Sequence, residues 1–567
     1  MLKLPYGISD FEVIRKEGYL YVDKTKYIEQ LEEIGRYLFF IRPRRFGKSL
    51  FLSTLEHYYD INRGSQFERL FGGLYIGKNP TDLRNKFAVL KLNFSGLKTD
   101  SKGNVEESFR KTVLSGLIQF VESYYRFFNH PEEIIYRLEK ETDLKHMLEI
   151  VYNAVRKIDK KIYLIIDEYD HFANDIIAMG DEIYYQNIVR ASVFVRDFYE
   201  TIKIGTQGVI DRIFITGISP IMLDDLTSGF NIILNITMDP VTNEMLGFTE
   251  EEVEEIIKQI KISEDVLDHK RLKKLLEEYY NGYLFNEDCS KRVYNPDMIF
   301  YYFDQWLRHK KPPKVLIADN VKTDYGRLNR LVKNKANREI MENIIKNEKI
   351  TADIVSKFSF DRMYDQKYFV SLLFYLGLLT IDQKIRTRLL LKIPNFVIKT
   401  VFWEYFEQKL TEEYKLVLKE EELKTAIEAM AYDGEIKPYI EFISKNVLKV
   451  LSNRDLMKFD EKYLKVILIS FLIQSNIYKP ISEREVENGY IDIFLEKDIG
   501  FVDVKYEWLW ELKYIKRREK DQLERIREEG LAQLREYADS NVFRDKKNLK
   551  KALIIFIGKG EYEIVNL

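Results

Sequence analysis

Gly47, Lys48 and Ser49 are the residues of this chain best suited to phosphate chemistry. A phosphate-binding loop needs inward-facing backbone N–H groups, a helix N-terminus behind them, a lysine for the β- and γ-phosphates and a hydroxyl for Mg²⁺. The strand-like run YLFFIR precedes the tripeptide, and the helix-like run LFLSTLEHYYD follows it closely. We therefore expect a P-loop that binds ATP and Mg²⁺, with Ser49 as a metal ligand. The expected nucleotide contacts in the loop are Arg45, Phe46, Gly47, Lys48 and Ser49.

This loop departs from the generic motif G-x-x-x-x-G-K-S/T at its first position. Arg42 stands where the generic motif has glycine. Taken alone, the run RPRRFGKS also fits a basic loop that caps a helix, so the motif needs a second, independent signal.

The acidic pair Asp167 and Glu168 provides that signal, because it directly follows the apolar run from Tyr163 to Ile166. At the carboxyl end of a buried strand, an Asp holds Mg²⁺ through water and a Glu orients the attacking water. Carboxylates that only cap a strand are the alternative. We expect Asp167 to contact the nucleotide and its metal, and Glu168 to be catalytic.

A second set of reactive residues lies in the C-terminal quarter. The period-two alternation along Tyr490–Glu496 places Asp492 on the face opposite its apolar neighbours, and the same alternation in Trp508–Tyr514 gives Glu511 and Lys513 a shared face. Phosphodiester hydrolysis needs divalent cations held by oxygen ligands. We expect Asp492 and Glu511 to bind Mg²⁺, or Mn²⁺, and Lys513 to position water or stabilise charge, all three being catalytic.

Glu-x-Lys alone is also what a surface strand of a Glu- and Lys-rich chain would show. A zinc site of the histidine type is disfavoured, because none of the 6 His residues lies in this quarter. The single cysteine, Cys289, excludes a disulfide framework within the chain and a Cys-based zinc site.

Five strand candidates with helices between them must position the N-terminal residues. They predict a parallel α/β sheet covered on both faces. The fourth candidate ends at Thr216, which either senses the γ-phosphate beside the acidic strand or is an ordinary strand-end residue. The candidates are Tyr37–Arg42, Phe87–Asn93, Tyr163–Ile166, Arg212–Thr216 and Ile232–Met238.

The middle of the chain is predicted to be helical, with Thr249 as an N-cap. The aromatic run YYNGYLF, from Tyr279 to Phe285, is expected to pack between this helical lid and the sheet. Between Asp365 and Trp403, a helix, two strands and the basic turn QKIRTR predict a winged helix. Such a wing either contacts DNA or only packs between domains.

Size and composition fit a globular protein of roughly three domains, since 567 residues exceed one core. The net charge of −2 limits nucleic-acid binding to a local patch. The N-terminus lacks a secretory pattern, and the longest apolar stretch, Phe369–Ile381, is shorter than the roughly 18 residues of a membrane span. We expect a cytoplasmic protein with no membrane partner.

Several segments resemble an AAA-ATPase-like family whose members carry a C-terminal PD-(D/E)XK nuclease-like domain. The resemblance implies that RPRRFGKS is the usual loop of the family and that Asp167 and Glu168 take the Walker B positions of its DEYD motif. It also implies that Asp23-Lys24-Thr25 match a DKT motif, for which a structural turn is the alternative. The matching segments are LPYGISDFEVIRKEGYLYVDKT, RPRRFGKSL, LIIDEYDHF and FITGISPIMLDDLTSGFNI.

In the C-terminal part, the resemblance identifies Asp492, Glu511 and Lys513 with the PD-(D/E)XK signature. Glu483 matches a helix-end acid of the family and is a further expected metal ligand, with Glu485 and Glu487 as rivals. Gln533 and Tyr537 match a Q-x-x-x-Y motif that would flank the catalytic face.

The resemblance implies three domains: a P-loop AAA-like ATPase domain (1–247), a helical lid with a winged helix (248–440) and a restriction-endonuclease-like α/β domain (441–567). We expect an ATPase and Mg²⁺-dependent nuclease that cleaves DNA under nucleotide control, with a role in defence against mobile elements as the biological guess. The alternatives are a switch that binds nucleic acid or a protein without cutting, and a plain NTPase whose C-terminal domain assembles a homo-oligomer.

Overall fold

The computed structural model forms two compact units, each built from more than one stretch of chain. The first comprises residues 1–308, 327–340 and 349–396, and the second comprises 309–326, 341–348 and 397–567. The structure describes residues 2–97, 102–171, 193–221, 230–261, 268–318, 332, 335–357, 365–451, 460–486, 489–498, 500, 503–544 and 546–567, without the side chains of 102–104, 193 and 483–486.

A five-stranded parallel sheet organises the first unit, in the order β2-β3-β4-β1-β5. Strand β4 therefore lies between β1, which leads into the phosphate loop, and β3, which ends in the acidic pair. The strands are β1 (Tyr37–Ile41), β2 (Ala88–Asn93), β3 (Ile162–Asp167), β4 (Ile210–Gly217) and β5 (Leu234–Asn235).

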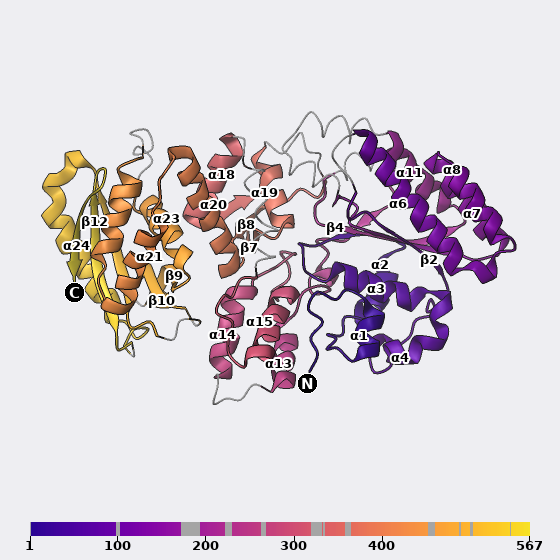
Figure 1. Ribbon diagram of the computed structural model, residues 1–567, viewed down its shortest axis with the longest axis horizontal. Helices are drawn as coiled ribbons and strands as arrows, with labels where there is room; N and C mark the ends of the chain where they lie inside the picture. The colour runs from indigo at the N-terminus through magenta and orange to yellow at the C-terminus, as the bar shows by residue number, and fades with distance from the viewer. Residues whose placement is uncertain are drawn as a thin grey trace. The chain divides into compact units, whose positions relative to one another are not determined.

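Helices cover both faces of this sheet, as the sequence predicts (Figure 1). One group contains α1, α2, α3 and α4, and the other contains α6, α7, α8 and α11. The helices are α1 (Phe11–Glu17), α2 (Lys26–Ile34), α3 (Lys48–Tyr59), α4 (Phe67–Phe71), α5 (Tyr75–Lys78), α6 (Lys102–Ser123), α7 (Pro131–Lys140), α8 (Leu144–Lys157) and α11 (Val193–Gly205).

The fifth strand is shorter than the predicted Ile232–Met238, since β5 contains only Leu234 and Asn235. The Asn235 side chain accepts the N–H of Thr237 at 3.0 Å, so the chain turns where the prediction continues the strand. An apolar run cannot reveal this local side-chain turn.

Three helices follow the sheet: α13 (Glu250–Ile260), α14 (His269–Tyr280) and α15 (Pro296–His309). The predicted N-cap is confirmed, because Thr249 and Glu252 form a reciprocal capping box at the start of α13. Two orphan N–H groups of the helix end are satisfied in this way.

The helix and hairpin predicted between Asp365 and Trp403 are also present. Helix α19 (Gln366–Tyr375) precedes β7 (Thr380–Ile385) and β8 (Arg388–Lys392), and β6 (Lys349–Ala352) completes an antiparallel sheet in the order β6-β8-β7. The strands extend further into QKIRTR than predicted, because Ile385 pairs with Arg388 and leaves only two residues in the turn.

The second unit contains a mixed sheet in the order β13-β12-β11-β10-β9, in which only β11 and β12 are parallel. Its strands are β9 (Tyr478–Val486), β10 (Gly489–Lys497), β11 (Glu507–Ile515), β12 (Leu549–Ile557) and β13 (Glu561–Asn566). Its helices are α20 (Phe396–Tyr414), α21 (Glu420–Glu428), α22 (Lys437–Ile443), α23 (Glu461–Leu472) and α24 (Leu523–Ala538), together with most of α18 (Lys335–Asn347).

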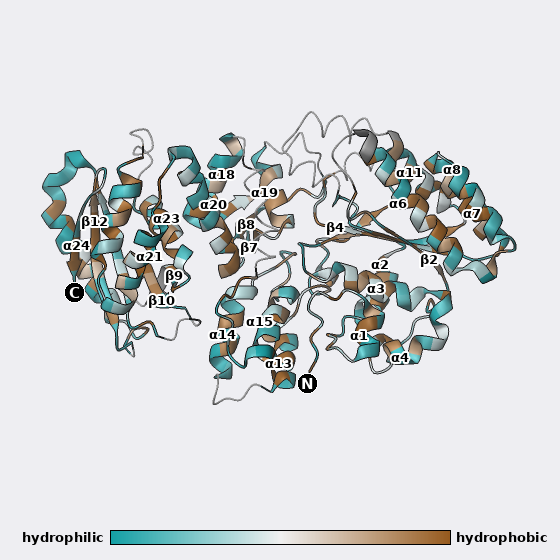
Figure 2. Ribbon diagram, in the orientation of Figure 1, coloured by the Kyte–Doolittle hydropathy of each residue, from teal (hydrophilic) through white to brown (hydrophobic). Residues whose placement is uncertain are grey.

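Apolar strands form the core of each unit, while the helices alternate hydrophilic and hydrophobic positions (Figure 2). In the second unit, one face of the sheet packs against α24 through a fully buried cluster. Its members include Phe494, Leu509, Leu534, Leu553 and Ile555. Among the described helices, none has the length and apolarity needed to cross a membrane.

Candidate functional sites

Strand β1 and helix α3 hold the phosphate loop between them. Gly47 has φ +89° and immediately precedes α3, so the loop turns through a conformation that favours glycine. The Nζ atom of Lys48 donates to the carbonyl oxygens of Arg42 and Pro43 at 2.9 Å each. Burial lowers the pKa of Lys48 to about 8, although Asp167 opposes this shift. The lysine is thus folded back onto its own loop.

The loop and the acidic strand are joined directly, because Ser49 Oγ donates to Asp167 Oδ2 at 2.9 Å. Burial raises the pKa of Asp167, while the Ser49 hydrogen bond opposes the rise. The hydroxyl and the carboxylate expected to share Mg²⁺ therefore lie within one hydrogen bond of each other.

Glu168 has a positive φ of +50° and lies beside His171. The distance between His171 Nδ1 and Glu168 Oε2 is 3.1 Å, and this contact lowers the pKa of the Glu168 carboxyl. The expected catalytic Glu is thus an anion held by a neighbouring ring. His171 is not among the residues expected from the sequence, although it stands directly after the DEYD run.

Thr216 is buried in β4, and its Oγ1 has no hydrogen-bond partner among the described residues. Its strand end is held by the second half of DEYD. Asp170 accepts the N–H groups of Ile218 and Ser219 at 3.1 and 2.7 Å, and Tyr169 donates to the carbonyl of Ser219 at 2.6 Å. Tyr169 and Asp170 therefore fix the strand end that carries Thr216.

Arg42 has a structural reason to replace the first glycine of the loop. Its side chain is 1% exposed and donates to the carbonyls of Thr237 and Thr242 at 2.7 and 2.8 Å. The guanidinium also lies over the rings of Phe40 and Phe285, 4.3 and 4.0 Å from their centroids. Arg42 thus ties the loop to the chain that follows β5.

The aromatic turn packs as predicted, because Phe46 of the loop contacts the rings of Tyr283 and Phe285 edge-on at 5.0 and 5.6 Å. Arg45, with φ +66°, pairs with Asp297 of α15 at 3.2 Å. This ion pair connects the phosphate loop with α15.

The DKT motif forms the turn that the sequence analysis gave as the alternative. Asp23 accepts the N–H of Thr25 at 2.9 Å and that of Tyr75 at 2.7 Å. Lys24 is 8% exposed and pairs with Glu252 of α13 at 2.7 Å. The motif therefore connects the N-terminal segment with the helices after the sheet.

The second site lies on adjacent strands of the C-terminal sheet. Asp492 of β10 accepts the N–H of Leu512 on β11 at 2.9 Å, and Lys513 donates to Glu511 Oε1 at 2.8 Å. The structure thus brings the three predicted residues Asp492, Glu511 and Lys513 together.

Glu511 is 4% exposed, and its Oε2 atom has no hydrogen-bond partner in the described part of the chain. Burial and the nearby Asp492 raise its pKa to about 7. Burial opposes the charge of Lys513, but Glu511 more than compensates and raises the lysine pKa. A buried carboxylate oxygen without a partner is a costly feature that a bound cation would relieve.

Glu461, the first residue of α23, is an acidic residue near this site that is not among those expected from the sequence. Its Oε1 accepts the N–H of Tyr514 at 3.4 Å. Burial raises the pKa of Glu461, Lys513 lowers it and Asp492 raises it, so the carboxylate lies within electrostatic reach of the site. The signal was the adjacent Asp460, which caps α23 and fixes where this helix begins.

Position 483 is not at the helix end that the resemblance implies, because residues 478–486 form β9. Ser482 pairs with Ile493 and Arg484 with Ile491, so position 483 lies across from Asp492. The side chains of Glu483 and Glu485, and all of Glu487, lie outside the described residues. Among the side chains that are described, no group of three or more His, Cys, Asp or Glu could hold a metal ion.

Gln533 and Tyr537 both lie on α24, as predicted. Burial and Glu511 raise the pKa of Tyr537, and a Cβ atom on Gly489 would lie 2.9 Å from its hydroxyl. Tyr537 is therefore near the start of β10. Gln533 Oε1 is buried and has no hydrogen-bond partner among the described residues.

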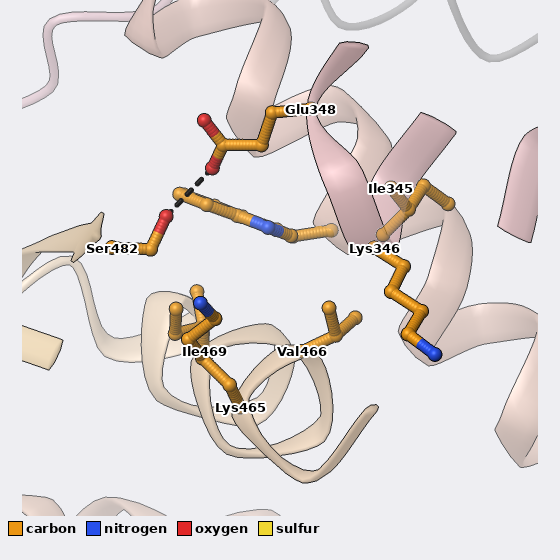
Figure 3. A pocket seen from close by; sticks show the side chains of 8 residues that line it. Ile345, Lys346, Glu348, Lys465, Val466, Ile469 and Ser482 are labelled. Carbon is orange, nitrogen blue, oxygen red and sulfur yellow. Dashed lines mark hydrogen bonds between the residues drawn. The ribbon is translucent and has the colours of Figure 1, made fainter. Parts of the chain in front are cut away.

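A small pocket lies elsewhere in the second unit (Figure 3). Glu348, with φ +56°, accepts hydrogen bonds from Ser482 at 2.6 Å and from Lys399 at 2.5 Å. Burial opposes the charge of Glu348, but Lys399 holds its pKa below the usual value. The pocket is lined by Ile345, Lys346, Glu348, Trp403, Lys465, Val466, Ile469 and Ser482.

Comparison with protein families gives two matches. Residues 5–227 match the family described as "Predicted AAA-ATPase", and residues 459–564 match the PD-(D/E)XK nuclease superfamily. Both matched regions contain one of the sites described above.

Individual relatives add less. An uncharacterized protein in the vnfD 5′ region of Azotobacter chroococcum mcd 1 is 27% identical over 316 residues, which are 53% of this chain and 52% of the relative. The chain thus spans about half the length of that relative. Among solved structures, a Walker-type ATPase of Pyrococcus abyssi superposes with a TM-score of 0.38 and 11% sequence identity. The superposition covers 67% of this chain and 94% of the ATPase chain.

Proposed function

Because an AAA-ATPase-like domain and a PD-(D/E)XK nuclease superfamily domain share this chain, we propose that it is an ATP-binding, metal-dependent nuclease that cleaves DNA under nucleotide control. The observation that carries the proposal is the buried Oε2 of Glu511, which lies beside Asp492 and Lys513 and has no hydrogen-bond partner among the described residues. A surface strand would leave such a carboxylate in water.

At the nucleotide site, Lys48 would leave the carbonyls of Arg42 and Pro43 and bind the β- and γ-phosphates. Ser49 and Asp167 would hold Mg²⁺. Glu168 would leave its contact with His171 and orient the attacking water. The remaining proposed contacts are the backbone of Arg45, Phe46 and Gly47, and the Thr216 hydroxyl.

At the nuclease site, Asp492 and Glu511 offer the oxygen ligands that Mg²⁺ or Mn²⁺ prefers, and Glu483 is proposed as a third ligand. A cation bound there would supply Lewis acidity. Lys513 would keep Glu511 oriented and ionised and would stabilise negative charge on the phosphate.

The proposed division of the chain is an ATPase domain (1–247), a lid and winged-helix region (248–440) and a nuclease domain (441–567). In this scheme nucleotide binding rearranges the middle region and so controls access to Asp492, Glu511 and Lys513. We further propose a cytoplasmic protein that acts in defence against mobile elements.

Cleavage of duplex DNA by the full-length protein, in Mg²⁺ or Mn²⁺ and with or without ATP, tests this function. We expect Asp492→Ala to abolish cleavage and Lys48→Ala to abolish its dependence on ATP. Asp503→Ala is the matched control, because Asp503 is an exposed aspartate of the same domain. Cleavage that survives Asp492→Ala would refute the site, and ATP dependence that survives Lys48→Ala would refute the control.

A switch that binds nucleic acid or a protein without cutting is the second candidate. It is favoured by the departure of the loop from the generic motif at Arg42 and by the near-neutral net charge of −2. Calorimetric titration with Mn²⁺ separates the two candidates. Binding that Glu511→Gln abolishes supports the nuclease, and no measurable binding to the wild-type protein supports the switch.

A further inference from the structure

The sheet β6-β8-β7 carries a concentration of positive charge that the proposed active sites do not use. Its segments 349–352 and 380–392 contain five Lys or Arg residues and one Asp, a formal charge of +4 in a chain of −2. Residues 383–388, the end of the hairpin, are all exposed. The hairpin is therefore a local basic surface on a slightly acidic protein.

The single acid of these segments is already neutralised. Asp382 pairs with Lys349 at 2.9 Å and with Lys392 at 2.7 Å. Burial opposes the charge of Asp382, but its lysine partners lower its pKa, so it is an anion. On the same strand, β7, Lys384 pairs with Glu287 at 3.4 Å.

Two arginines at the end of the hairpin differ from these paired lysines. Neither Arg386 nor Arg388 has a hydrogen-bond or ion-pair partner in the portion of the chain that is described. Arg386 occupies the turn with φ +57°, and Arg388 begins the return strand opposite Ile385, which is 42% exposed. A guanidinium with free donors is well suited to phosphate oxygens.

The neighbouring helix does not offer a competing surface. Residues 369–375 of α19 are all buried, so beyond its first turn this helix presents no side chain that could read base edges in a DNA groove. Recognition by this region must therefore come from the hairpin and be directed at the backbone, which carries no sequence information.

We propose that the β7–β8 hairpin binds the phosphate backbone of duplex DNA through Arg386 and Arg388, with little sequence preference. This inference rests on the proposed function, for which it supplies the DNA-holding surface. Binding of labelled duplex DNA of mixed sequence is measured in EDTA, where a metal-dependent nuclease does not cut, over a range of salt concentrations.

The variant is the full-length protein with Arg386→Gln and Arg388→Gln. We expect its affinity to fall at least about tenfold at 0.1 M salt, and the slope of log K against log salt to fall by about 2, one for each lost phosphate contact. Lys270→Gln with Arg271→Gln removes the same charge from the exposed start of α14 and should change neither quantity by much.

Unchanged affinity and slope in the hairpin variant would overturn the proposal, as would an equal loss in the α14 variant. Displacement of DNA by polyglutamate at equal charge would also overturn it, because the surface would then suit an acidic protein. Cleavage by the wild-type protein with no hairpin effect refutes only this inference. Hairpin-dependent binding without cleavage refutes only the nuclease.

Discussion

The hydroxyl of Ser49 and the carboxylate of Asp167 lie 2.9 Å apart, although 118 residues separate them in the chain. Parallel strands explain the meeting, because β1 and β3 end at the same edge of the sheet on either side of β4. One hydrogen bond therefore connects the two motifs on which nucleotide binding depends.

Ser49→Ala should weaken binding of ATP in the presence of Mg²⁺ by about tenfold or more, since a metal ligand is lost. Binding without Mg²⁺ should change little, and Ser49→Thr, which keeps the hydroxyl, should bind like the wild-type protein. Titration with a fluorescent ATP analogue, with and without Mg²⁺, measures all three. Equal Mg²⁺-dependent affinities for Ser49→Ala and wild type would contradict the assignment.

Gly217→Ala should destabilise the first unit. The new Cβ atom would lie 2.2 Å from Asp170 Oδ1 and 2.6 Å from the Tyr169 ring, so the DEYD segment would have to move. We expect a loss of about 1–3 kcal/mol and weaker ATP binding. Gly64→Ala is the control, because nothing lies within 4 Å of its Cβ position. Thermal unfolding of both variants decides the matter, and equal midpoints would rule out the predicted clash.

Arg42→Lys should be destabilising even though the charge is kept. A lysine lacks the planar fork that reaches Thr237 and Thr242 together while lying between two rings. We expect a cost of about 1–3 kcal/mol from the carbonyl left without a partner. Urea unfolding measures this cost, and Arg36→Lys, at an exposed arginine, serves as the control. A variant as stable as wild type would show that the bridging contacts contribute little.

The buried Glu511 makes stability depend on pH in the metal-free protein. Its pKa is raised to about 7 in the folded state from 4.5, so the folded protein binds more protons than the unfolded chain between these values. The free energy of unfolding therefore falls as pH rises through this window. Glu511→Gln removes the charge and should stabilise the second unit at pH 8, by on the order of 2 kcal/mol.

The gain from Glu511→Gln should disappear near pH 4.5, where the wild-type carboxyl is protonated in both states. Thermal unfolding in EDTA at several pH values measures it. Asp503→Asn, at an exposed position of the same domain, should show no such trend. A gain that does not vary with pH would mean that packing, and not ionisation, is responsible.

Periodicity and motif spacing predict much of this structure because they reflect local rules. The strands that lead to Lys48 and Asp167, the cap at Thr249 and the shared face of Glu511 and Lys513 all follow from neighbouring residues. The partners of a side chain that are distant in the sequence do not follow from these local rules. No residue near Arg42 in the sequence indicates that its side chain binds the carbonyls of Thr237 and Thr242. From the sequence alone, Arg42 is therefore only a departure from the generic P-loop motif.

The same limit explains the acids of the C-terminal site. Glu461 and Glu483 both stand in acidic, mixed segments, and the only local sign that Glu461 begins a helix is the capping residue Asp460. The structure places Glu461 at the start of α23 and position 483 within β9. Only the pairing of β9 with β10 reveals that position 483 lies opposite Asp492 on the neighbouring strand.

The discontinuous make-up of the second unit has a practical consequence for anyone who dissects the protein. The chain passes between the units five times, at 308/309, 326/327, 340/341, 348/349 and 396/397. A fragment that begins at residue 441 would lack Ile344 and Ile345, both buried, and Glu348, which binds Ser482. Cutting at a boundary drawn along the sequence would thus remove part of the interior of the second unit. A shortened gene that keeps residues 309–567 retains these positions.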